Sequence, residues 1–265
     1  MMSAAQAEQA RVEMDRLLGL MREIFRGGLA ATIAGVVFLG FGSRLVMRIS
    51  ALLNPEAKGV ITENENIVGE ITFEGTIELV GFIGIFGGFL VGICWVIVRE
   101  WLPRDPVQRV LLAGVLTALV GSPAVVAADN RDFQLLDPPL LHVAMFVALL
   151  GLAGSSTALL DDRLERRLPT GTGASAVFGG LAGLGLVFAA PLFLAAFFLD
   201  GDWFAGFALI AVAIATVAGW VRYYSDGEGG LAGRPAWQRR LASVGLAGLA
   251  VFGAIHLARE IESIL

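Results

Sequence analysis

The sequence predicts an all-α integral membrane protein: a seven-helix bundle with an amphipathic N-terminal helix and a small outer β-hairpin between its first two spans. Three observations predict this class. The 265 residues are 56% hydrophobic and 16% charged, with a mean hydropathy of +0.75, whereas soluble domains carry about 25% charged residues. The apolar residues gather in runs of roughly 20, the length at which a helix crosses a bilayer. Short polar connections separate these runs.

The first 26 residues predict an amphipathic helix, and residues 27–265 a single transmembrane domain. Ser3 and Gln6 form a capping-box pattern. Apolar side chains then recur at helical spacing, at Met14, Leu17, Leu18, Met21 and Phe25. An interfacial helix on the inner membrane surface is the expected form. A docking helix for a partner subunit is the alternative.

Hydropathy and length predict seven spans. They fall at about residues 27–48, 76–98, 107–128, 139–160, 173–199, 203–222 and 239–258. With the N-terminus inside, 14 of the 19 basic residues lie in inner segments, and the outer side holds only Arg44, Arg48, Lys58, Arg131 and Arg259. This bias predicts a cytoplasmic N-terminus and an outer C-terminus.

Arginine accounts for every basic residue except Lys58, which together with abundant Gly and Ala is typical of a GC-rich bacterial genome. The expected location is therefore the bacterial inner membrane.

Prolines mark the expected ends and bends of the spans. Pro103 and Pro106 separate the second and third spans. Pro139 is expected at the first turn of the fourth span, where a missing N–H costs little. Pro123 and Pro191 lie inside apolar runs and predict kinks.

The connection at about residues 54–75 is the longest on the outer side. It carries β-branched runs on both sides of the polar stretch at residues 63–66. This pattern predicts a small β-hairpin. Because a lone hairpin is only marginally stable in water, we expect it to lie over the helix ends.

Charged residues gather where the first two spans reach the outer side. Arg44 and Arg48 close the first span, and Glu78 is expected about one turn into the second. Ionisable groups inside spans are costly and indicate functional sites. These three residues and Asp129 of the next outer loop are the candidate contacts for an ion or substrate. For Glu78 the alternative is a structural role in the first helical turn after a Thr76 cap.

The two histidines of the chain, His142 and His256, are expected at similar depth near the outer boundary. Two histidines on different helices can hold a haem iron. They are the candidate cofactor residues, against the alternative of hydrogen-bonded structural groups. No Cys-based metal site is expected, because the chain has one cysteine.

Glycines repeat at four-residue spacing at Gly84, Gly88 and Gly92, and again at Gly179 and Gly183. Such a row in an apolar helix lets a second backbone approach closely. Packing within the bundle is the expected use, and a homo-oligomer or partner face is the alternative.

The sequence contains no catalytic motif, and its net charge of −5 gives no indication of nucleic-acid binding. The expected function is a non-enzymatic subunit or scaffold of a membrane complex, with the bilayer and a protein subunit as partners. A small-solute or ion transporter using the outer Arg/Glu/His cluster is the first alternative. A bis-histidine haem or metal redox protein is the second.

Overall fold

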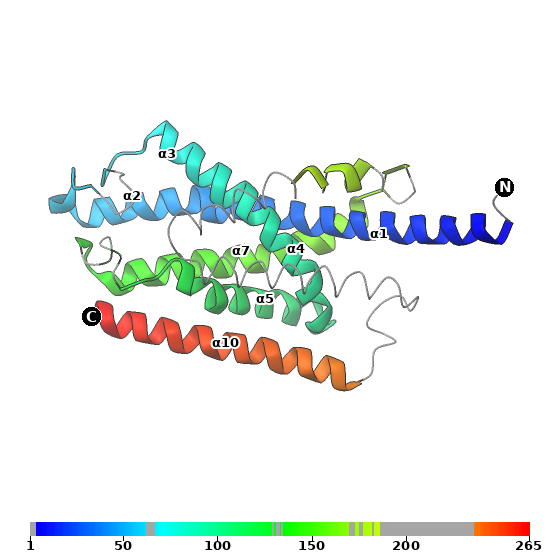
Figure 1. Cartoon of the computed structure of the whole chain (residues 1–265). Coiled ribbons are helices and arrows are strands. Elements are labelled where there is room, and N and C mark those ends of the chain that lie inside the picture. The colour runs from blue at the N-terminus through cyan, green and yellow to red at the C-terminus, as the bar shows by residue number, and fades with distance from the viewer. Residues whose placement is uncertain are drawn as a thin grey trace.

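The computed structural model describes residues 4–61, 67–128, 130, 133, 135–169, 173–174, 177–181, 183–185 and 236–265. These residues form helices joined by short connections, and no strand occurs among them (Figure 1). Four of the described helices are long and apolar enough to cross a membrane: Gln6–Leu53, Phe73–Trp101, Pro139–Arg167 and Ser243–Ile264. The described residues are therefore helical and membrane-compatible, as the sequence predicts. Most of the expected spans 173–199 and 203–222 lies outside them.

The first helix is longer than expected. α1 (Ala4–Ala34), the π-helical η1 (Gly35–Gly42) and α2 (Ser43–Leu53) follow one another without a break. At a rise of 1.5 Å per residue they extend over about 75 Å, against roughly 30 Å of hydrocarbon. The backbone does not bend at residue 26, so the amphipathic segment continues the axis of the first span and projects beyond the neighbouring helices (Figure 1). This differs from the expected helix on the membrane surface. Ser3 of the expected capping box is outside the described residues.

The second helix consists of α3 (Phe73–Glu78), η3 (Leu79–Gly87), α4 (Gly88–Val98) and η4 (Arg99–Trp101). Its N-cap is Thr72, whose hydroxyl accepts a hydrogen bond from the Gly75 N–H at 3.3 Å. The expected Thr76 cap is therefore wrong. The Thr76 hydroxyl instead donates to the Thr72 carbonyl, and Glu78 lies beyond the first turn of the helix.

The glycine row of the second helix lies against the first helix, which runs antiparallel to it. A Cβ on Gly88 would lie 2.8 Å from the Ala31 carbonyl oxygen and 2.9 Å from the Thr32 Cα. One on Gly84 would lie 3.0 Å from the Val36 Cα, and one on Gly92 would overlap the backbone of Gly27. The two backbones are thus in contact over at least two turns, which leaves no room for side chains.

The described bundle also contains α5 (Pro106–Gly121), α7 (Pro139–Arg167) and α10 (Ala236–Ile264). α5 ends at Gly121 and a short 3-10 turn, η5 (Ser122–Ala124), follows. Pro123 therefore belongs to the end of this helix and does not kink a longer span.

Different glycines mediate the contacts of these helices. A Cβ on Gly154 of α7 would lie 2.6 Å from the Ala113 carbonyl oxygen of α5, and one on Gly253 of α10 would overlap the Leu119 carbonyl. Of the second predicted row, Gly179 would meet Met21 at 2.8 Å, whereas Gly183 has no described atom within 4 Å of its Cβ position.

The connection between the first two helices contains no β-hairpin in its described residues. A short 3-10 turn, η2 (Pro55–Ala57), is followed by one isolated antiparallel bridge between Ile61 and Ile67. The Val68 N–H donates to the Val60 carbonyl at 2.9 Å. A two-stranded ribbon is marginal without a packed face, and here the chain instead lies against α2. Residues 62–66 are outside the described part.

Candidate functional site

Charged residues from three helices meet at one end of the bundle, around the buried Arg26 and Asp161. We call this group the Arg26 cluster, and it consists of Arg22, Glu23, Arg26, Arg99, Asp161 and Glu165. Its centre is Asp161 of α7, which is 2% exposed. The Arg26 Nε donates to its Oδ1 at 2.7 Å, and the Arg99 Nη1 donates to Oδ1 and Oδ2 at 3.0 and 2.7 Å. One carboxylate therefore joins α1, α7 and the end of the second helix.

Glu23 closes the cluster on the α1 side. Its Oε2 accepts hydrogen bonds from Arg26 Nη2, at 2.9 Å, and from Arg99 Nη2. The third nitrogen of Arg26, Nη1, lies 3.3 Å from Glu165 Oε1, which is an ion-pair distance without hydrogen-bond geometry. The cluster holds as many carboxylates as arginines, so its buried charges are compensated.

Arg22 provides hydrogen bonds to the carbonyls at the end of α7. Its guanidinium donates to the carbonyls of Leu168, at 3.1 Å, and Pro169, at 3.3 Å. The last carbonyls of a helix have no partner within the helix, so a cation there is favourable. Arg109 of α5 pairs with Asp162 at 3.0 Å. These contacts hold the helix ends together, and each of these charges already has a partner within the protein.

The opposite end, which we call the Arg44 end, is held by side chains that bond to backbone groups. Asn54 is 1% exposed, and its amide exchanges hydrogen bonds with the backbone of Asp137: the Asp137 N–H donates to Oδ1 at 2.7 Å, and Nδ2 donates to the Asp137 carbonyl at 2.9 Å. At α10, the Glu260 carboxylate accepts a hydrogen bond from the Ala128 N–H at 2.6 Å. Side-chain bonds to backbone thus connect the loops at this end.

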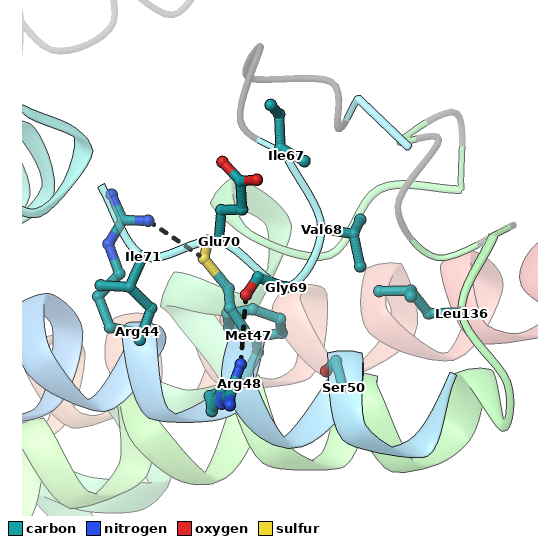
Figure 2. Close-up of a pocket in the computed structure, with 11 residues that line it drawn as sticks. Arg44, Met47, Arg48, Ser50, Ile67, Val68, Gly69, Glu70, Ile71 and Leu136 are labelled. Atoms are coloured by element: carbon teal, nitrogen blue, oxygen red, sulfur yellow. Dashed lines mark hydrogen bonds between the residues drawn. The ribbon is translucent and has the colours of Figure 1, made fainter. Parts of the chain in front are cut away.

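Arg44 is buried at this end without a charged contact among the described residues. It is 6% exposed, and its Nε and Nη2 atoms have no described hydrogen-bond partner. Its Nη1 approaches only the Met47 sulfur, at 3.9 Å. Arg44 lines a cavity of about 70 Å³ between α2 and the chain segment that returns to the second helix (Figure 2). The cavity is lined by Arg44, Met47, Arg48, Ser50, Ile67, Val68, Gly69, Glu70, Ile71, Leu136 and Phe146.

The other predicted ion or substrate contacts have different surroundings. Arg48 lines the same cavity, and its Nη1 donates to the Gly69 carbonyl at 3.2 Å. Glu78 is exposed and does not line the cavity. Asp129 is outside the described residues. The structure therefore places the two predicted arginines at the cavity. Glu78 lies outside the described lining and attracts Arg44 electrostatically without forming an ion pair.

Each histidine has its own local partner. His142 is 1% exposed, and its Nδ1 lies 3.0 Å from the Pro138 carbonyl oxygen. His256 Nε2 lies 3.7 Å from the Glu260 carboxylate one turn away. His142 Nε2 and His256 Nδ1 are buried without a described hydrogen-bond partner. No described interaction joins the two rings. Among the described residues, no three His, Cys, Asp or Glu side chains group as a metal site.

The sequence matches no protein-family model, and no curated protein or solved structure is significantly similar to it.

Sequence reasoning treated Arg26 and Arg99 only as inner-side charges and did not single out Asp161. A signal was present, because the positive-inside count puts both arginines at the same end as the close of the fourth span. Asp161 and Glu165 follow that span four residues apart, on one helical face.

Proposed function

We propose that this chain is a seven-span protein of the bacterial inner membrane, with its N-terminus in the cytoplasm, that acts as a non-enzymatic subunit or scaffold of a membrane complex. The observation that carries the proposal is the rigid attachment of the projecting first helix. Arg26 fixes α1 to α7 through Asp161, and the glycine contacts fix the same helix to the second one. A helix held in this way can position a partner at a fixed distance from the bilayer.

The projecting part of α1 continues an apolar stripe that the bundle already uses. Nearest the bundle, Met21 lies under Gly179, and Phe25 stacks on Phe178 with ring centroids 4.8 Å apart. Further out on the same stripe, Met14 and Leu17 are about half exposed among the described residues. The same face that packs within the chain thus extends outward, which supports a protein partner on the cytoplasmic side.

The test is purification in nanodiscs followed by mass spectrometry of retained proteins. A stoichiometric partner is expected with the unmodified chain and should be lost with the double variant Met14→Glu/Leu17→Glu. The matched control is Arg11→Gln/Asp15→Asn, at two exposed polar positions of the same helix. A chain that retains no protein in any form, or the same protein in all forms, would exclude this use of α1.

A transporter is the second candidate, and the cavity beside Arg44 favours it. Transporter sites usually lie near the midplane of the membrane, whereas this cavity lies at one end of the bundle. Alternating access would also require the first two helices to separate where their backbones are in contact. Uptake of a labelled anion into proteoliposomes, abolished by Arg44→Met, would favour transport over the scaffold.

The haem alternative requires His142 and His256 to release their local partners or to use the remaining nitrogens. An absorption spectrum of the purified protein tests it directly. A Soret band that disappears with His142→Ala would establish haem and displace the scaffold proposal.

A further inference from the structure

Arg44, which lines the cavity, has two guanidinium nitrogens without a described hydrogen-bond partner. Nε and Nη2 are neighbouring nitrogens on one side of the guanidinium, and both are buried without a partner. This side of an arginine binds two oxygens of a carboxylate or phosphate through parallel N–H groups. Glu78 attracts Arg44 electrostatically but forms no ion pair with it, so the buried charge is only partly compensated. A buried charge without hydrogen-bond partners is strongly unfavourable, so an anion bound to Arg44 would remove part of this penalty.

The charge of the cavity also favours an anion. Arg44 and Arg48 are its basic lining residues and Glu70 is its acidic one. Figure 2 shows the Glu70 carboxylate pointing away from the helix that carries the arginines. Glu70 is exposed, whereas Arg44 is buried. The inner part of the cavity is therefore positive.

The size and surroundings of the cavity indicate which anion fits. A volume of about 70 Å³ holds several water molecules, which is enough for a phosphate group. Leu45 beside Arg44, Ile71 of the lining and Phe73 at the start of α3 are all more than half exposed. An anion bound here would thus have apolar surface next to it.

The depth of Arg44 agrees with a lipid headgroup. Arg44 lies four residues before the end of the first apolar run, at residue 48, which corresponds to about 6 Å along the helix. The polar headgroup layer on each side of a bilayer is about 5–7 Å thick. An arginine side chain is long enough to reach from this depth into the headgroup layer.

We propose that the cavity is a phosphate-type oxyanion site, in which the guanidinium of Arg44 binds the anion and Arg48 adds positive charge at the rim. Its favoured occupant is the phosphate of an anionic phospholipid from the leaflet at the Arg44 end, with the acyl chains along Leu45 and Phe73. This site is independent of the scaffold proposal, because it involves neither α1 nor the Arg26 cluster.

The test is thermal unfolding of the full chain in nanodiscs of phosphatidylcholine alone, of phosphatidylcholine mixed with phosphatidylglycerol, and of phosphatidylcholine with added inorganic phosphate. Phosphatidylglycerol is expected to raise the melting temperature of the unmodified chain. Arg44→Met should weaken the apparent affinity for this lipid on the order of thirtyfold. Arg259→Met, an exposed arginine at the same end on α10, should keep the full response.

The three media distinguish the source of the anion. A response to phosphatidylglycerol but not to inorganic phosphate supports the lipid. An equal response to inorganic phosphate supports the same oxyanion site with a soluble occupant. A response that Arg44→Met leaves unchanged, or the absence of any response to either anion, overturns the proposal.

A second variant keeps the test decisive if Arg44→Met fails to fold. Arg44→Lys retains the charge but loses the two-nitrogen edge, so it should fold and respond more weakly to phosphatidylglycerol. Native mass spectrometry of the unmodified chain should show one retained anionic lipid. Loss of a protein partner from the Met14→Glu/Leu17→Glu variant would leave these lipid responses intact, so the two proposals fail separately.

Discussion

Arg26 and Arg44 lie on the same continuous helix, about five turns apart, and both are almost fully buried. Their surroundings differ completely. Arg26 is surrounded by Asp161, Glu23 and Glu165, whereas two of the three nitrogens of Arg44 have no described partner. Burial alone therefore does not indicate the role of an arginine in a membrane helix.

The difference separates a structural charge from a binding charge. At the Arg26 cluster the protein supplies both signs, so the site is neutral and complete. At the Arg44 end the chain supplies the positive charge and a cavity beside it. The missing negative charge is the part that a ligand can provide.

The largest expected effect comes from removing the centre of the Arg26 cluster. Asp161→Asn leaves Arg26 and Arg99 without their shared carboxylate and should lower the free energy of unfolding by about 3–5 kcal/mol. Unfolding in SDS-containing mixed micelles measures this change. The control is Asp162→Asn, which removes the partly exposed pair with Arg109 and should lose at most about 1 kcal/mol. Equal losses would show that the cluster is not a special feature of this end.

The next largest effect is expected at the close contact between the first two helices, which connects both ends of the bundle. Gly88→Ala should lower the free energy of unfolding by about 2–3 kcal/mol, because its Cβ would press on the backbone of Ala31 and Thr32. Gly81→Ala, with no atom within 4 Å of its Cβ position, should be neutral or stabilising by about 0.5–1 kcal/mol. The same mixed-micelle measurement applies, and a stable Gly88→Ala would mean that the two helices can separate.

A smaller effect is expected from the uncharged connection at the Arg44 end. Asn54→Ala leaves the backbone N–H and carbonyl of Asp137 without this buried amide and should lower the free energy of unfolding by about 1–2 kcal/mol. Glu56→Ala, at an exposed position of the same connection, should change it by no more than about 0.5 kcal/mol. If Asn54→Ala lowered the free energy of unfolding as much as Asp161→Asn, the difference between the Arg26 cluster and the Asn54 connection would disappear.

The smallest effect is expected from Arg44→Met, and Arg26→Met provides the direct comparison of the two arginines. In phosphatidylcholine alone, Arg44→Met should leave the free energy of unfolding within about 1 kcal/mol or raise it, because no described partner is lost. Arg26→Met should lower it by about 3 kcal/mol, because it leaves buried carboxylates behind. Thermal unfolding of both variants in the same nanodiscs measures the contrast. If Arg44→Met strongly lowered the free energy of unfolding, Arg44 would have a structural partner within the protein. The two arginines would then not differ in role.

Several features of the fold could be predicted because they depend on the order of residues along the chain. The apolar runs predict helices, and the described part is helical. The extent of the elements was less predictable: the first helix begins more than twenty residues before its apolar run, and Thr72 caps the second helix in place of Thr76. Local patterns do not decide helix ends, since neighbouring turns compete for the same hydrogen bonds.

The candidate site was predicted in part. Arg44 and Arg48 were singled out because charged residues inside an apolar run are unusual in any membrane helix. Glu78 was grouped with them by depth alone, but it is exposed and outside the cavity. Depth follows from position in the sequence, whereas the direction in which a helical residue points depends on how the helix is rotated in the bundle.

The sequence by itself determined the helical class and the apolar segments, because transfer of side chains into hydrocarbon depends mainly on composition and length. Only the tertiary structure decided which charges meet. Arg26 and Asp161 are 135 residues apart in the chain and bond at 2.7 Å, while two nitrogens of Arg44, at similar burial, have no described hydrogen-bond partner. The physical reason is that a charge in a low-dielectric interior is governed by the few atoms within hydrogen-bond reach, and those atoms come from other helices.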